Sequence, residues 1–183
     1  MELELQPTLH DDLVVLRPML LSDFDNLFAA ASDPLIWEQH PAKTRYTEPV
    51  FRDFFAAAVE SRGALVVMDQ ATQRVIGTSR YAGYSPAASV VEIGWTFLAR
   101  AYWGGKYNAA VKALMLRHAF GAVQSVVFKV GQHNIRSQRA VLKLGAKIEG
   151  EVSAGGFPSL CFRLSRDAYF SRVSAPATDQ NNV

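Results

Sequence analysis

The feature that most constrains the fold is the stretch 91–108, VEIGWTFLARAYWGGKYN, because a strand pattern there leads into a glycine turn and then into a helix pattern. In its first half apolar and polar side chains alternate, which predicts a strand. The side chains expected on one face are Ile93, Trp95 and Phe97, and those on the other are Glu92 and Thr96. After the turn, apolar side chains recur at helical spacing from Ala109 to Phe120.

A glycine turn between a strand and a helix can bind an anion. The first turn of a helix leaves backbone N–H groups unpaired and carries a partial positive charge, and glycine lets a phosphate approach the backbone. Lys106 adds a full charge at the same place. The turn matches neither a Walker loop nor a G-x-G-x-x-G motif. On its own, a Gly-Gly pair before a helix is more often an ordinary turn than a ligand site.

A second motif makes a ligand site the better interpretation of this turn. The sequence Asn134-Ile135-Arg136-Ser137 is followed, after seven residues, by Gly145-Ala146. With the EIGW strand and the WGGKYN turn before it, the chain resembles the GNAT superfamily of N-acetyltransferases. The likeness is greatest to the RimJ/RimL-type branch, which acetylates ribosomal-protein N-termini and other amines. The motif residues of this second part are Asn134, Ser137, Lys143, Gly145 and Ala146, and the resemblance covers residues 10–170.

The resemblance implies an α/β (α+β) GNAT fold with a central mixed, mostly antiparallel sheet of six or seven strands. Helices cover both faces of that sheet, and two central strands splay apart. The periodicity agrees, because it predicts a strand, two helices, three strands, a helix, a strand, a helix and two final strands. We expect a polar lead-in over residues 1–12, one domain over residues 1–172 and a disordered tail over residues 173–183. Before Gly145 we expect Val141, Leu142 and Leu144 to point inward.

The resemblance also implies that acetyl-CoA binds as a cosubstrate, and no metal is expected. The residues assigned to it are Phe97, Leu98, Trp103, Gly104, Gly105, Lys106, Tyr107, Asn108, Asn134, Arg136 and Arg139. Backbone N–H groups near Phe97 and Leu98 would polarise the thioester carbonyl. The turn departs from the superfamily pattern Q/R-x-x-G-x-G/A, because Lys106 and Asn108 occupy the two small positions and the glycines come earlier. The phosphate cradle is therefore expected to be built differently.

Two residues are candidates for proton transfer. Glu92 is the only acid between Gln70 and Glu149, and a carboxylate on an otherwise apolar strand suits a general base, either directly or through water. The alternative is a structural carboxylate paired with an arginine such as Arg80. Ser137 follows Asn134 by one helical turn and, by resemblance, protonates the departing thiolate. The alternative for Ser137 is a small residue that packs the helix.

Charge and cysteine content limit which ligands the chain is expected to bind and in which compartment it is expected to occur. Nine Lys or Arg and no acid occur from Ile93 to Ile148, which is a solvated basic face or a polyanion site. Because these residues surround the turn and the Asn134 helix, coenzyme A fits better than nucleic acid, and no nucleic-acid motif is present. Cys161 is the only cysteine, so neither a disulfide within the chain nor a Cys/His metal cluster is expected. We expect a cytoplasmic protein without a signal peptide or a membrane span.

The predicted function is therefore transfer of an acetyl group from acetyl-CoA to a primary amine, either a protein N-terminus or a small molecule. One alternative is a non-catalytic acyl-CoA-binding sensor or structural module, and a nucleotide-binding enzyme is a more distant one. The N-terminal acids Asp23, Asp25, Asp33, Glu38 and Glu48 either attract a cationic amine or form a solvated surface. The identity of the amine and a homodimeric assembly are left open.

Overall fold

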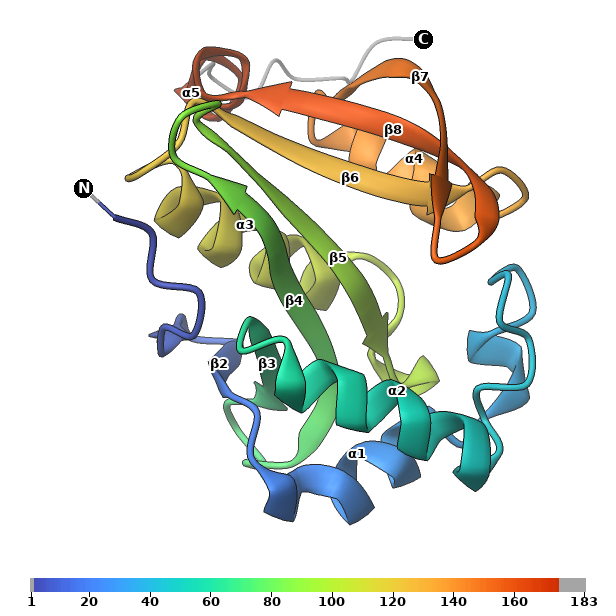
Figure 1. Cartoon of the computed structure of the whole chain (residues 1–183). Coiled ribbons are helices and arrows are strands. Elements are labelled where there is room, and N and C mark those ends of the chain that lie inside the picture. The colour runs from blue at the N-terminus through green and yellow to red at the C-terminus, as the bar shows by residue number, and fades with distance from the viewer. Residues whose placement is uncertain (1, 175–183) are drawn as a thin grey trace, which may run out of the picture.

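The computed structural model describes residues 2–174, and within them one mixed sheet carries five α-helices (Figure 1). The strands are β1 Leu9–His10, β2 Val14–Pro18, β3 Ala64–Asp69, β4 Val75–Ser85, β5 Val90–Leu98, β6 Ser125–Gly131, β7 Lys147–Ala154 and β8 Phe157–Ser165. The helices are α1 Phe24–Ala31, α2 Glu48–Glu60, α3 Lys106–Ala119, α4 Ile135–Lys143 and α5 Arg166–Ser174. Three 3-10 turns are η1 Leu21–Asp23, η2 Pro34–Ile36 and η3 Arg100–Tyr102.

The sheet order is β1-β2-β3-β4-β5-β6-β8-β7, and only β5 and β6 pair in parallel. The expected fold class, a mixed and mostly antiparallel sheet with helices on both faces, is confirmed. The described residues hold eight strands, one more than the sequence pattern predicted. The additional strand, β1, lies in the segment expected to be a polar lead-in, where Leu3 is also buried in the core. The predicted tail lies outside the described residues from residue 175 onward, and α5 continues to Ser174.

Two hydrophobic cores lie on the two faces of the sheet. Helix α3 covers one face and contributes Val111 and Met115 to a core that also includes side chains of α4 and α5. Helices α1 and α2 cover part of the other face with an aromatic cluster that includes Phe51 and Phe97 (Figure 1). Helix α2 is amphipathic, with Phe51, Phe54 and Phe55 buried at helical spacing.

The alternation predicted along β5 is wrong beyond Gly94. Thr78 pairs with Phe97 and Arg80 pairs with Gly94, so β5 has one extra residue over this step, and Trp95 adopts φ +51°. Such a bulge moves the following side chains to the opposite faces. Ile93 therefore packs in the α3 core, Phe97 packs against α2, and Trp95 is 38% exposed.

Strands β5 and β6 splay apart as expected. They pair only over Val90–Glu92 and Ser125–Val127, although β5 continues to Leu98 and β6 to Gly131. Figure 1 shows the two strands diverging from a common end, with α3 behind them. Beyond β6, α4 buries Val141, but Leu142, which was expected inward, is 45% exposed. A side chain directly after a buried helical position points about 100° away from it, which explains the error.

Candidate active site

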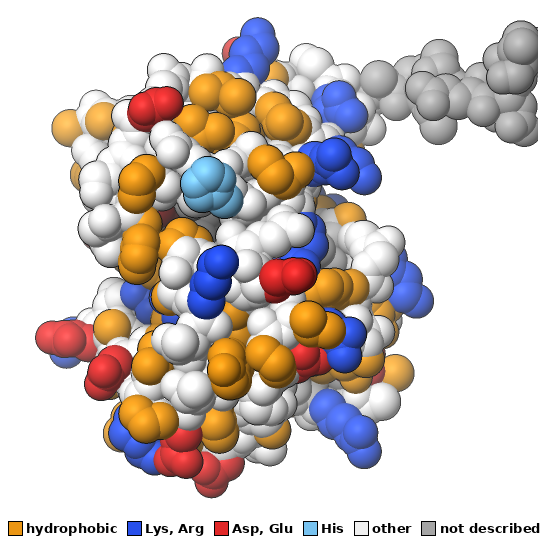
Figure 2. Space-filling model, turned by 90° about the vertical axis from the view of Figure 1, so that its right-hand side faces the viewer, with side chains coloured by type: hydrophobic (Ala, Val, Ile, Leu, Met, Phe, Trp, Pro, Cys, Tyr) orange, Lys and Arg blue, Asp and Glu red, His pale blue; other side chains and the backbone are white. Residues whose placement is uncertain are grey.

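A cavity of about 530 Å³ lies where β5 and β6 separate. Its walls come from these two strands, from the start of α3, from α4 and from residues 36–45 before α2. On the face shown in Figure 2, a recess separates the upper part of the molecule from the lower part, and hydrophobic side chains lie along its rim. Segments far apart in the sequence therefore share one site.

The start of α3 forms one end of this cavity. Gly104 and Gly105 have φ near +105°, and nothing lies within 4 Å of where a Cβ would stand at either residue. The first intrahelical bond runs from the N–H of Ala109 to the carbonyl of Gly105. The N–H groups of Lys106, Tyr107 and Asn108 therefore have no partner within the helix. This arrangement fits the diphosphate of a coenzyme A.

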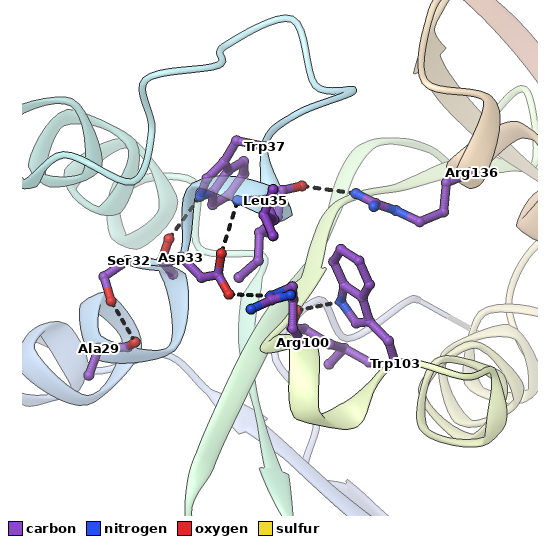
Figure 3. Close-up of polar contacts among 11 residues, drawn as sticks. Ala29, Ser32, Asp33, Leu35, Trp37, Arg100, Trp103 and Arg136 are labelled. Atoms are coloured by element: carbon purple, nitrogen blue, oxygen red, sulfur yellow. Dashed lines mark hydrogen bonds and ion pairs between the residues drawn. The ribbon is translucent and has the colours of Figure 1, made fainter.

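Trp103 and Arg136 close one wall of the cavity. The Trp103 indole Nε1 donates to the carbonyl of Leu98 at 2.9 Å, and the Arg136 guanidinium stacks 4.0 Å above the indole ring. Arg136 also donates to the carbonyl of Ile36 at 2.9 Å, as Figure 3 shows. In the same view Arg100 of η3 pairs with Asp33 before η2. The segment around η2 is thus held to both α4 and η3.

Asn134 and Ser137 occupy the start of α4. The buried Asn134 side chain accepts a hydrogen bond from the Ser137 N–H at 3.2 Å and so caps the helix. Ser137 lines the cavity. Among the described residues its hydroxyl makes no hydrogen bond, so it is free to meet a ligand.

Glu92 lies at the last paired position of the splayed strands. Its side chain lines the cavity, the residue is 7% exposed, and the Lys129 Nζ on β6 lies 2.7 Å from its carboxylate. The structural alternative proposed an arginine as the partner of Glu92, but the partner is this lysine. The ion pair with Lys129 holds this carboxylate, the candidate proton acceptor, at the point where the two strands separate.

The predicted cosubstrate residues do not all reach the cavity. Those that line it are Phe97, Leu98, Trp103, Gly104, Gly105, Asn108, Asn134 and Arg136. The side chains of Lys106, Tyr107 and Arg139 do not. The Tyr107 hydroxyl donates a hydrogen bond to Asp69 at 2.7 Å, which raises the pKa of Tyr107. Its backbone N–H, in the first turn of α3, has no partner within the helix. Lys106 lies beside the Tyr107 ring, and Arg139 is exposed.

Lys112 is a cavity residue that the sequence analysis did not single out. It is 6% exposed, burial lowers its pKa to about 7, and its Nζ donates to the Thr96 hydroxyl at 2.6 Å. Lys112 shares a helix face with Met115 and Ala119, since the three follow at i, i+3 and i+7. Both of those residues are buried, so this spacing was a signal that the lysine faces inward.

A second set of missed residues lies between α2 and the bulge of β5. Arg45 and Arg80 both approach the Phe54 ring, with guanidinium carbons 4.5 Å and 6.0 Å from its centre. Burial lowers the pKa of each to about 10. For Arg45 the neighbouring Arg80 acts in the same direction as burial, whereas for Arg80 the charge of Glu92 acts in the opposite direction. Burial, together with Arg45, lowers the pKa of His40 to about 4. No local pattern in the sequence predicts that these residues meet.

The described residues offer neither a metal site nor a helix that could span a membrane. Over residues 2–174, no group of three or more His, Cys, Asp and Glu side chains is placed to hold a metal ion. None of the helices in this part of the chain has the length and apolar character that crossing a membrane requires.

Comparison with known proteins gives a family match. A family model described as an acetyltransferase (GNAT) domain matches residues 14–147, well over half of the chain. No curated protein matches the sequence.

Several solved structures share the fold. A GCN5-related N-acetyltransferase from Brucella melitensis superposes with a TM-score of 0.79 at 20% identity, over 91% of this chain and 81% of that one. An acetyltransferase of the GNAT family from Bacillus anthracis gives 0.72 at 16% identity, over 88% and 99%. RimJ from Mycobacterium smegmatis, in complex with CoA-disulfide, gives 0.68 at 17% identity, over 91% and 92%. At these identities the likeness is one of fold.

Proposed function

Because the chain belongs to the acetyltransferase (GNAT) family, we propose that it transfers an acetyl group from acetyl-CoA directly to a primary amine. The acceptor is a small-molecule amine or a protein N-terminus, and the RimJ/RimL-type branch is the proposed subgroup. The observation that carries the proposal is the cavity between the splayed strands. A helix start with unpaired N–H groups lies at one end of it, and a carboxylate and a hydroxyl line its walls.

The chain's own groups account for binding. When bound, acetyl-CoA supplies the acetyl group as a thioester. The backbone N–H groups of residues 106–108 would hold its diphosphate, and Gly104 and Gly105 leave the space that phosphate oxygens need. Trp103 and Asn134 line the wall along which the rest of the molecule would lie. Phe97 and Leu98 line the same cavity, and their backbone N–H groups would polarise the thioester carbonyl.

Glu92 and Ser137 carry the proton transfers in this proposal. The acceptor arrives as an ammonium ion, and Glu92 accepts one of its protons directly or through a water. The amine nitrogen then forms its bond to the carbonyl carbon, and the bond from that carbon to sulfur breaks. Ser137 donates a proton to the departing thiolate sulfur, and the second proton that the nitrogen loses as the amide forms restores the Ser137 hydroxyl, directly or through a water. Glu92 returns its proton to solvent, so the products are the acetylated amine, free coenzyme A and one proton, with no change of oxidation state.

One observation favours the non-catalytic alternative. Lys129 pairs with Glu92 at 2.7 Å, and a base needs its lone pair free for the incoming ammonium. In the catalytic proposal the Lys129 ammonium instead holds the carboxylate in position, and the second oxygen accepts the proton. The half-exposed Lys129 side chain is able to move aside. A measurement of amine-dependent turnover distinguishes an acetyltransferase from a non-catalytic acyl-CoA-binding module.

The experiment is a coupled assay of free thiol release from acetyl-CoA with a panel of amines. The panel contains polyamines, aminoglycosides, free amino acids and short peptides with a free N-terminus. Amine-dependent thiol release is the expected result. Binding of acetyl-CoA without any amine-dependent release would support the sensor instead. Displacement of coenzyme A by ATP would support the nucleotide-binding alternative.

A further inference from the structure

Neither arginine of the pair Arg45 and Arg80 forms an ion pair within the described residues, although the charge of Glu92 is near enough to offset part of the effect of burial, which lowers the pKa of Arg80. Arg45 lines the cavity, and Arg80 lies behind its wall against Trp95, with the guanidinium carbon 4.6 Å from the ring centre. The Nε atoms of both are shielded from solvent and make no hydrogen bond within the described residues. Buried unpaired donors on a charged group are costly and rare, so they require an explanation.

His40, which lies next to Arg45, adds a second donor that has no acceptor. The Ala42 N–H donates to Nδ1 of His40 at 2.9 Å, so that nitrogen carries no proton. With its pKa near 4, His40 is neutral at pH 7, and its proton must lie on Nε2. Nε2 lies 3.3 Å from the Arg45 NH1 nitrogen, which is also a donor. Two donors therefore face each other where an acceptor atom would satisfy both.

Three of the five N-terminal acids pair with other arginines. Asp23 pairs with Arg17, Asp33 with Arg100 and Glu48 with Arg52. Glu92, the carboxylate of the cavity, forms its ion pair with Lys129 and acts on Arg80 only through its longer-range charge. None of these four acids therefore pairs directly with Arg45 or Arg80. The aromatic rings of Trp37 and Phe54 stack on Arg45 and hold its plane in place, but a ring face cannot accept the fork of N–H bonds that an arginine offers to a carboxylate.

We infer that the acceptor is a small amine that also carries a carboxylate, as a free amino acid does, and that Arg45 binds this carboxylate while the amine faces Glu92. Arg80 adds its charge from behind the cavity wall. This inference rests on the proposed function and selects among its acceptors. A protein N-terminus has a neutral peptide group where an amino acid has its carboxylate, so it would leave the arginine pair unpaired.

The test compares each free L-amino acid with its carboxamide as acceptor. For at least one pair, kcat/KM for the acid should exceed that for the amide by about 10- to 100-fold, which is the value of a charge-assisted hydrogen bond. Arg45→Met keeps an apolar stem between Trp37 and Phe54 but removes the fork, so it should raise KM for the acid and leave the amide unchanged. Arg80→Met should act in the same direction more weakly.

Two controls show whether the variants report on the carboxylate. Arg74→Met removes an exposed arginine of the β3–β4 turn and should change neither acceptor. The melting temperature of Arg45→Met should stay the same or rise, because the variant no longer buries an unpaired charge. If that variant does not fold, Arg45→Gln, which retains a polar end without the charge, replaces it in the comparison.

The outcomes are distinct from those of the proposed function. Amides used as well as acids throughout the panel, or a preference for acids that survives in both arginine variants, would overturn the inference while leaving acetyl transfer in place. If no amine is consumed, calorimetric titration of the amino acids in the presence of coenzyme A decides. Binding that Arg45→Met abolishes supports the carboxylate site, and no binding overturns it.

Discussion

The carboxylate of Glu92 and the ammonium of Lys129 meet at 2.7 Å across β5 and β6, where Glu92 is the last paired residue of β5 and Lys129 lies two residues beyond its β6 partner, Val127. The ion pair therefore lies at the closed end of the gap into which the cavity opens. A group placed there contacts both halves of the molecule, and its removal should affect chemistry more than folding.

Glu92→Gln should reduce kcat by roughly 10²- to 10⁴-fold, because the amide has the same shape but cannot accept the ammonium proton. The affinity for acetyl-CoA should stay nearly unchanged. Steady-state kinetics measures kcat, and calorimetric titration measures the affinity for acetyl-CoA.

Ser137→Ala is the companion to that experiment and should be milder, because water replaces a hydroxyl proton donor more easily than a carboxylate. A Glu92→Gln enzyme within a few-fold of the parent rate would make Glu92 structural. Deprotonation would then fall to solvent or to the amine itself.

Gly105→Val should weaken acetyl-CoA binding more than it weakens folding. The residue caps α3 at φ +106°, where a β-branched side chain is strained, and the new methyl groups would enter the open space in front of the N–H groups. Gly83→Val is the matched control, because Gly83 also has positive φ and open space around it but does not line the cavity. Calorimetric Kd values and melting temperatures should show a loss of affinity in Gly105→Val alone. Equal affinity in the two variants would place the phosphate site elsewhere.

Acetyl-CoA at millimolar concentration should raise the melting temperature, because a ligand that binds only the folded state stabilises it. Dephospho-CoA should bind more weakly than coenzyme A. Since Arg136 already bonds Ile36 and stacks on Trp103, the exposed Arg139 is the freer partner for the 3′-phosphate. Arg139→Met should then remove most of the difference, and Arg117→Met, near the far end of α3, should not. Equal affinity of the parent protein for the two ligands would refute this role.

Lys112→Met should stabilise the protein in a pH-dependent way. Burial lowers the pKa of Lys112 from 10.5 to about 7, so between these values the unfolded chain binds more protons than the folded one. The free energy of unfolding of the parent should therefore rise with pH, relative to the variant, by up to about 1.4 kcal/mol per pH unit. The advantage of Lys112→Met should be largest at and below pH 7 and should shrink toward pH 10.5.

Urea denaturation at several pH values measures this difference. Lys43→Met, at an exposed lysine before α2, is the control and should show the same stability difference at every pH. A Lys112→Met difference that does not vary with pH would mean that the lysine keeps its ordinary titration.

The sequence by itself determined the order of the elements after β1, because periodicity, glycine stops and apolar faces act within a few residues of the chain. The glycine start of α3 is an example. It also determined that an acidic residue on a strand precedes a glycine turn at the start of a helix. Most of the positions that the motifs assign to the cosubstrate line one cavity because the fold brings the two motif segments together.

Only the tertiary structure decided which charges meet. One extra residue at Trp95 moves the side chains that follow it in β5 to the opposite faces of the sheet, and no local pattern in the sequence predicts this bulge. The pairing of Glu92 with Lys129, and the meeting of Arg45 with Arg80 around Phe54, join residues that are 35 or more positions apart. Such contacts depend on how strands and helices pack, and the free energy of burying a charge depends on every group around it.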